Sequence, residues 1–303
     1  MFKLAVFTDE VSQDLERVIQ VCKDYELDGV ELRSLWDKPP HELSDDEIAR
    51  LRDRLWEESL EVCCIASPFF KCDLGNRAHY EEHIGILKRC CEVAHRLGTD
   101  IVRGFTFWTN HDPESVWSDI LANFEEPKRI LADEDIRLGI ENESSTMVGS
   151  ARLCAKFLED VDSPNIHAIW DACNEIHYNA EHGQPQDGTY AEGFDRPFPE
   201  AYERVKDRII HVHIKDGEAN PAQKTARCVR VGEGVLDFPG QLRALSDDGY
   251  DGYISLETHW RLSGDLSQDL INRPGGADYS QTGELASRLC LDNLTAMVQE
   301  LYA

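Results

Sequence analysis

Predicted strands and helices alternate along this chain eight times, and that alternation constrains its fold more than any other feature. Each short apolar run is followed by residues whose apolar side chains recur every three or four positions, the pattern of an amphipathic helix. Alternation of this kind is typical of a parallel sheet covered by helices. The eight strands are predicted at residues 3–9, 29–33, 60–67, 100–107, 136–142, 165–171, 209–215 and 253–258.

Eight strand–helix units predict one (β/α)₈ barrel that takes up residues 1–303 as a single domain. About 250 residues is typical of such a barrel, and 41% hydrophobic residues suffice for its core. We expect Pro68 to end the third strand. Two connections, 174–196 after the sixth strand and 260–282 after the eighth, are longer than a turn requires. Loops of that length are usually functional or disordered, and we expect both to cover a site at the C-terminal end of the barrel.

Four polar residues stand near the C-terminal ends of the last four predicted strands: Glu141, Asp171, His213 and Glu257. In a (β/α)₈ barrel these strand ends meet at one mouth, where active sites lie. Alternation places all four on the barrel-facing side, because the apolar residues beside them suit packing against helices. Taken singly, each is better explained as a polar residue on the surface or at a strand end. Four in phase favour a divalent-metal site with mixed oxygen and nitrogen ligands.

The net charge of -27 argues against a nucleic-acid partner, because binding to phosphates requires Lys and Arg. The acidic residues are spread along the chain, which is typical of a solvated, repulsive surface; adaptation to high salt is the alternative. We expect no membrane span, since no apolar run of 18 residues occurs, and no signal peptide, since the N-terminus enters a strand directly. The ten cysteines include adjacent pairs but no CxxC, which favours buried reduced thiols in a cytoplasmic protein.

Eight short segments, each weak by itself, together resemble the xylose-isomerase-like TIM-barrel family of sugar-phosphate isomerases and epimerases. Within that family the chain is similar to keto-sugar 3-epimerases and inosose dehydratases, and the resemblance covers essentially its whole length. It implies that Glu141, Asp171, His213 and Glu257 bind the metal. The segments are GVELRSLWD at Gly29, CIASPFFKCD at Cys64, VRGF at Val102, GIENE at Gly139, IWDACN at Ile169, HVHIKDG at His211, VGEGVLDF at Val231 and YISLETH at Tyr253.

The sequence departs from the pattern of related proteins at two places, and both departures bear on the activity and substrate that the resemblance implies. Metal-dependent apurinic-site endonucleases share the barrel but bind three zinc ions with additional histidines. This chain lacks those histidines, and Ala226 and Cys228 stand where an Asp-x-His is expected, so nuclease activity is not expected. Asn174 stands three residues after Asp171, where some relatives have histidine, and this leaves the class of sugar open.

The ligand set also predicts a chemistry. Hard oxygen ligands favour one Mn²⁺ ion, with Mg²⁺, Co²⁺ and Zn²⁺ as alternatives. The ion would act as a Lewis acid on a sugar or polyol and stabilise an enediolate. Glu141 and Glu257, as catalytic residues, would remove and return the proton. We therefore expect a sugar or keto-sugar isomerase or epimerase. A lyase on the same site (an inosose dehydratase, or an enzyme that eliminates from an oxidised glycoside) is one alternative, and a non-catalytic carbohydrate-binding or partner subunit is another; a homo-oligomer is possible.

Other polar residues near the predicted mouth are candidates for substrate binding, and each has a structural alternative. Arg103 would otherwise pair with Glu10 or Glu31, and Glu31 with Arg33. His211 lies one pleat deeper than His213 and is either a supporting residue or a core histidine. Lys215 is expected to face outward, where it is solvated or paired with Asp216. The candidates are Glu31, Lys71, Arg103, Asn174 and His211.

Overall fold

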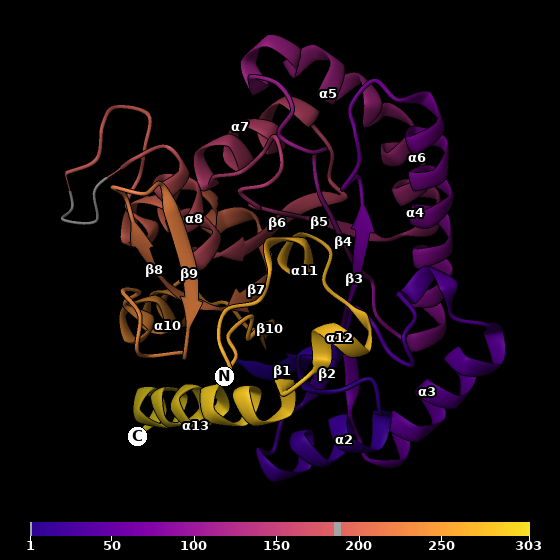
Figure 1. Cartoon of the computed structure of the whole chain (residues 1–303). Coiled ribbons are helices and arrows are strands. Elements are labelled where there is room, and N and C mark those ends of the chain that lie inside the picture. Colours follow the sequence, from indigo (N-terminus) through magenta and orange to yellow (C-terminus); the bar gives the residue numbers. More distant parts are fainter. Residues whose placement is uncertain (1, 185–188) are drawn as a thin grey trace.

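A computed structural model describes residues 2–184 and 189–303 of the chain and shows a closed barrel of eight parallel strands (Figure 1). Around the barrel the order is β1-β10-β7-β6-β5-β4-β3-β2, so each strand pairs with its neighbours along the chain and the first pairs with the last. The predicted (β/α)₈ fold is confirmed. The barrel strands are β1 Lys3–Phe7, β2 Gly29–Leu32, β3 Glu61–Phe69, β4 Ile101–Gly104, β5 Arg137–Glu141, β6 Ile166–Asp171, β7 Ile209–Ile214 and β10 Tyr253–Leu256.

Helices follow each barrel strand and cover the outside of the barrel. Local signals fix several of their ends. Ser44 and Glu47 form a capping box at the start of α3, and Gly98, with φ of 80°, ends α4. The longer helices are α2 Leu15–Asp24, α3 Asp45–Glu57, α4 Arg77–Leu97, α5 Trp117–Asn123, α6 Glu125–Glu134, α7 Ala151–Val161, α8 Ala172–Glu181, α10 Phe238–Asp247 and α13 Gly283–Tyr302. Shorter helical segments are α1 Thr8–Val11, η1 Pro40–Glu42, η2 Pro113–Val116, η3 Pro197–Ala201, α9 Tyr202–Val205, η4 Lys206–Arg208, α11 Gln268–Asn272 and α12 Gly276–Ser280.

The barrel strands divide the hydrophobic core into an outer and an inner part. Outward-facing strand residues such as Leu138, Trp170 and Leu256 belong to a large apolar layer between the sheet and the helices. A small cluster inside the barrel contains Ala5, Cys63, Cys64, Ile101 and Ile169. Since Asp171 follows Ile169 by two residues, the interior changes from apolar to polar toward the C-terminal ends of the strands. All ten cysteines lie in the described part of the chain, and each is a buried free thiol.

Pro68 does not end the third strand, contrary to the sequence-based expectation. Strand β3 continues to Phe69, and its pairing with β4 is irregular between Ile65 and Phe69. Proline lacks only the N–H group that a regular ladder would need, so an irregular stretch tolerates it. Among the described helices, none has both the length and the apolar character needed to cross a membrane.

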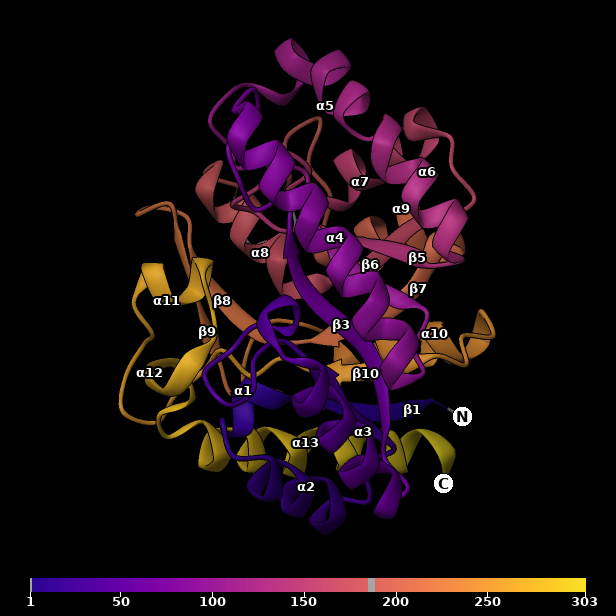
Figure 2. The same cartoon turned by 90° about the vertical axis from the view of Figure 1, so that its right-hand side faces the viewer.

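The two long connections contain structure of their own. Asp171 caps α8, so the first part of the predicted 174–196 loop is helical; residues 185–188 of that loop lie outside the described part of the chain. A hairpin of β8 Asp216–Asn220 and β9 Thr225–Val229, which was not predicted, follows β7. Figure 2 shows this hairpin with α11 and α12 at one end of the barrel, whereas both chain termini lie at the other.

Glu175 on α8 makes the stability of the fold depend on pH. Its carboxylate accepts a hydrogen bond from the backbone N–H of Ala151 (2.8 Å), and burial raises its pKa to about 8. Because the folded state holds this proton more tightly than the unfolded state, stability is lost as the pH rises from about 4.5 to about 8. Glu175→Gln keeps the acceptor but cannot ionise. It should therefore be more stable than the wild type at pH 9, by on the order of 1–3 kcal/mol, but not at pH 5.

Urea unfolding at both pH values measures this difference, and Glu159→Gln, on the exposed side of α7, is the matched control. A stability gain in Glu175→Gln that is the same at pH 5 and pH 9 would contradict the prediction.

Candidate metal centre and active site

Four buried side chains from successive strands converge inside the C-terminal end of the barrel. Glu141 and Asp171 are the last residues of β5 and β6, His213 lies near the end of β7, and Glu257 directly follows β10. One ligand atom from each lies within 4.8 Å of the other three. The Nδ1 atom of His213 is 3.5 Å from Oε1 of Glu141, 4.0 Å from Oδ2 of Asp171 and 4.0 Å from Oε2 of Glu257. Three carboxylates thus surround one imidazole nitrogen.

Two atoms of this group are buried without a hydrogen-bond partner among the described residues: Oδ2 of Asp171 and Nδ1 of His213. Near Oδ2 of Asp171 lies the Lys215 ammonium, 3.0 Å away but without hydrogen-bond geometry. Buried polar atoms are nearly always satisfied, so both atoms have capacity left for a further contact. Burial also raises the pKa of Asp171 to about 6; Lys215 opposes this rise, and the carboxylates of Glu257 and Glu141 add to it. Such crowding of negative charge is relieved by a divalent cation. The donor set and the two unpartnered atoms therefore fit a metal ion.

Glu31 lies behind His213 and fixes the orientation of its ring. The Glu31 carboxylate is 3.2 Å from Nε2 of His213 and 2.7 Å from Nε2 of His211. With its Nε2–H directed at Glu31, the His213 ring turns Nδ1 toward the three carboxylates, as metal-binding histidines do. Glu31 and His211 are fully buried, which suits support of His213 better than contact with a substrate. The ion pair expected between Glu31 and Arg33 is not formed, because Arg33 pairs with other carboxylates.

Lys215 points into the site, so the prediction that it faces outward is wrong. Its Nζ atom lies 2.7 Å from Oε2 of Glu257 and 3.0 Å from Oδ2 of Asp171, where it makes an ion pair without hydrogen-bond geometry. Strand β7 ends at Ile214, so strand alternation no longer sets the direction of the next side chain. Asp216, the other partner considered, instead accepts hydrogen bonds from the N–H groups of Gly217, Gly232 and Gly234.

Glu141 is held by two of the predicted substrate-binding residues. Nη1 of Arg103 is 3.0 Å from Oε2 of Glu141, and Nδ2 of Asn174 donates to Oε1 at 2.9 Å. Burial by itself would raise the pKa of Glu141, but Arg103 and His213 lower it to about 2. Arg103 thus pairs with Glu141, and not with Glu10 or Glu31 as was considered; its next carboxylate is Glu257, at 3.9 Å.

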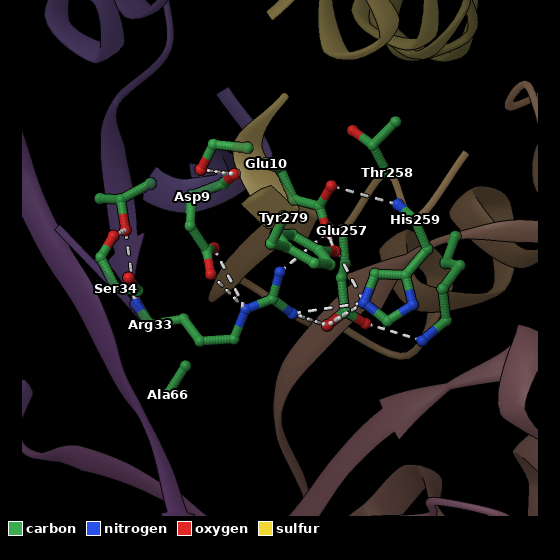
Figure 3. A network of polar contacts seen from close by, with 12 residues as sticks. Asp9, Glu10, Arg33, Ser34, Ala66, Glu257, Thr258, His259 and Tyr279 are labelled. Atoms are coloured by element: carbon green, nitrogen blue, oxygen red, sulfur yellow. Dashed lines mark hydrogen bonds and ion pairs between the residues drawn. The ribbon is translucent and has the colours of Figure 1, made fainter. Parts of the chain in front are cut away.

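An arginine-centred network holds Glu257 from the other side, as Figure 3 shows. The Arg33 guanidinium binds Asp9 (2.9 Å) and Glu10 (2.8 Å) and also contacts Glu257. Nε2 of His259 lies 3.3 Å from Oε1 of Glu257. Burial by itself would raise the pKa of Glu257, but Lys215, His259 and Arg33 lower it well below its ordinary value. This network was not predicted from the sequence, because its members lie up to 250 residues apart. The only sequence signal for it was a cluster of charged residues at strand ends.

A cavity of about 310 Å³ lies next to residues that contact this group, although none of the four converging side chains lines it. Arg33 and Arg103, which contact Glu257 and Glu141, line it together with Lys71. The aromatic rings of Phe105 and Trp108 form another part of its wall. Residues 272–274, from the 260–282 connection, also line it.

Comparison with known proteins identifies the family. The model of the xylose isomerase-like TIM barrel family matches residues 19–281, and the chain belongs to that family. An uncharacterized protein of Methanocaldococcus jannaschii, MJ1311, is 26% identical over 218 residues, which are 69% of this chain and 67% of that protein. Among solved structures, the IOLI protein with a binding zinc atom is 19% identical (TM-score 0.73), and the alignment covers 99% of both chains. L-ribulose 3-epimerase is 18% identical (TM-score 0.65), with 100% of this chain and 99% of that chain covered.

Proposed function

We propose that this protein is a divalent-metal-dependent isomerase or epimerase of a sugar or keto-sugar. The observation that carries the proposal is the convergence of three buried carboxylates on the unpartnered Nδ1 atom of His213. In this proposal Glu141, Asp171, His213 and Glu257 hold one ion, with Mn²⁺ favoured by the oxygen-rich ligand set. When bound, the ion polarises the carbonyl and the adjacent hydroxyl of the substrate. The zinc in the IOLI structure is consistent with a metal in this fold.

The proton is moved by two carboxylates. Glu141 and Glu257 come from β5 and from the end of β10, which are separated in the sheet by β6 and β7, so the two carboxylates reach the site from different directions. Glu257 takes the proton from the carbon next to the carbonyl, the C–H electron pair forms a C=C bond, and the π pair of the carbonyl moves to its oxygen and gives an enediolate. Glu141, after it takes up a proton from solvent, delivers that proton from the opposite face and gives the epimer, and Glu257 releases its own proton to solvent. Return at the neighbouring carbon gives the isomer instead.

The cavity lined by Arg33 and Arg103, which contact these carboxylates, suits a small polyhydroxylated substrate. Arg103 and Lys71 present hydrogen-bond donors along one part of its wall, and Phe105 and Trp108 offer apolar faces against which a sugar can lie. The fold-level likeness to L-ribulose 3-epimerase is in line with a substrate of this class.

Glu31 offers a test of the metal site that leaves its ligands in place. Glu31→Gln retains an oxygen acceptor for Nε2 of His213 but removes the charge that holds the ring in its metal-binding orientation. Loss of such a supporting carboxylate should weaken metal affinity by about 10–100-fold. Competition with a metal chelator measures this, and Glu61→Gln, an exposed carboxylate on β3, is the control. Equal affinity in Glu31→Gln and the wild type would contradict the role of Glu31.

The function itself is tested with metal-free protein loaded with Mn²⁺ and incubated in D₂O with ketoses, keto-sugars and inososes. Proton NMR should show a new epimer or isomer, with deuterium at the carbon next to the carbonyl. An unsaturated product would assign the protein to the lyases. Absence of any conversion, with metal bound at one ion per chain, would overturn the proposal.

A further inference from the structure

A second group of metal-binding side chains lies outside the carboxylate site, in the hairpin and the helix that border the barrel mouth. Cys173 and His177 are four residues apart on α8, and Cys228 lies on β9. One ligand atom from each lies within 4.8 Å of the other two. Sγ of Cys228 is 3.9 Å from Nε2 of His177.

The spacing on α8 directs two of these donors to one side. Residues at positions i and i+4 of a helix lie on the same face, so the Cys173 thiol and the His177 ring point toward the same neighbour. That neighbour is the hairpin, which lies beside α8 in both Figure 1 and Figure 2. The helix thus supplies a thiol and an imidazole, and the hairpin supplies the second thiol.

Gly217 lets the hairpin approach closely enough. It pairs with Cys228 across the hairpin, and a Cβ atom added to it would lie only 2.8 Å from Sγ of Cys173. A side chain at this position would therefore push the Cys173 thiol away from Cys228. The missing side chain leaves room in which the two sulfur atoms and the imidazole meet.

We propose that Cys173, His177 and Cys228 form a second metal site, which binds a thiophilic ion such as Zn²⁺. Tetrahedral zinc with Zn–S near 2.3 Å and Zn–N near 2.0–2.1 Å places its ligand atoms about 3.5–3.8 Å apart. The measured 3.9 Å between sulfur and nitrogen needs a shift of only a few tenths of an ångström. Both thiols lose their protons on binding, and the fourth position is left for water. The imidazole is half-buried, which gives the ion a path from solvent.

The two sites differ in the metals they prefer. Thiolates select soft ions, whereas three carboxylates and one imidazole suit harder ones. The sites are also joined through the chain, because Oδ1 of Asp171 accepts a hydrogen bond from the backbone N–H of Cys173 (2.8 Å). A metal on the thiolate site would hold the hairpin against α8 and steady the turn that carries Asp171. This inference does not depend on the proposed reaction.

Cobalt distinguishes the two sites, since only a thiolate ligand gives a sulfur-to-cobalt charge-transfer absorption in the near ultraviolet. Metal-free protein, kept reduced, should show this absorption on titration with Co²⁺ and should bind two ions per chain. Cys228→Ser should lose the absorption and bind one ion. His177→Ala, which changes a half-buried side chain and retains both thiols, should need at least tenfold more Co²⁺ to reach the same absorption.

Two controls separate this proposal from the proposed function. Cys290→Ser removes a buried thiol on α13 and should leave the absorption unchanged. His213→Ala should bind one ion fewer yet keep the absorption, whatever its effect on turnover. The proposal is overturned if wild-type protein with Co²⁺ shows no charge transfer, if Cys228→Ser retains it, or if mass spectrometry finds Cys173 and Cys228 joined as a disulfide in the reduced preparation.

Discussion

His213→Ala is expected to abolish stoichiometric metal binding at the carboxylate site while leaving the barrel folded. The substitution removes the only nitrogen among the four converging side chains and leaves three carboxylates that repel one another. Loss of a supporting residue lowers metal affinity by about 10–100-fold. Loss of a direct ligand should lower metal affinity further. Elemental analysis after dialysis against one equivalent of Mn²⁺ measures the bound ion, and circular dichroism reports the fold.

The controls follow from the positions of neighbouring residues. His167→Ala removes a histidine near the start of β6, at the opposite end of the barrel, and should bind metal as the wild type does. Asp171→Asn is a better second variant than Asp171→Ala, because Asp171 caps α8 and asparagine also caps helices well. It should lose the metal too. Wild-type metal content in both His213→Ala and Asp171→Asn would remove the assignment of the site.

The fold and the four converging residues could be predicted because they depend on short-range patterns. Eight alternations of strand and helix leave few topologies, and the residue at the end of each parallel strand must face the same mouth. Strand alternation then gave the direction of Glu141, Asp171, His213 and Glu257 without knowledge of any contact between them. Their metal binding is still a prediction.

The surroundings of these residues could not be predicted, because they depend on where regular structure stops. Lys215 lies one residue beyond β7, and alternation therefore gave it the wrong direction. The hairpin of β8 and β9 was missed, since its strands are short and mostly polar, with the sequences DGEAN and TARCV. Without that hairpin, Cys228 could not be brought near Cys173.

Ion pairing was the least predictable part. A choice of partner for Arg33 or Arg103 requires the relative positions of several strands at once. Arg33 pairs with the carboxylates of Asp9, Glu10 and Glu257. Glu31 pairs with two histidines instead. Local sequence favoured the nearer acid, Glu31, but the Glu31 carboxylate contacts the Nε2 atoms of His211 and His213 instead.

Glu257→Gln is expected to reduce turnover by about 10²–10⁴-fold, far more than it reduces metal occupancy. The amide keeps the size of the side chain and one oxygen ligand, but it cannot accept the proton from carbon. The amide NH₂ group would also face either Lys215 or Arg33, each of which contacts a carboxylate oxygen of Glu257 in the wild type. Glu143→Gln is the matched control, because it removes another, partly buried carboxylate that pairs with a cation, Lys71, at the cavity. It should retain most of its kcat.

The fate of a deuterium label shows whether the loss of turnover in Glu257→Gln reflects proton transfer by a carboxylate. If a carboxylate removes the proton, wild-type product formed in D₂O gains deuterium next to the carbonyl, unless the same proton is returned before it exchanges with solvent. Substrate that carries deuterium at the reacting carbon separates these cases. Partial loss of that label supports proton transfer through Glu257. Complete retention of the label, together with near-normal turnover in Glu257→Gln, would instead mean that hydrogen moves between carbons as hydride, and the enediolate mechanism would be wrong.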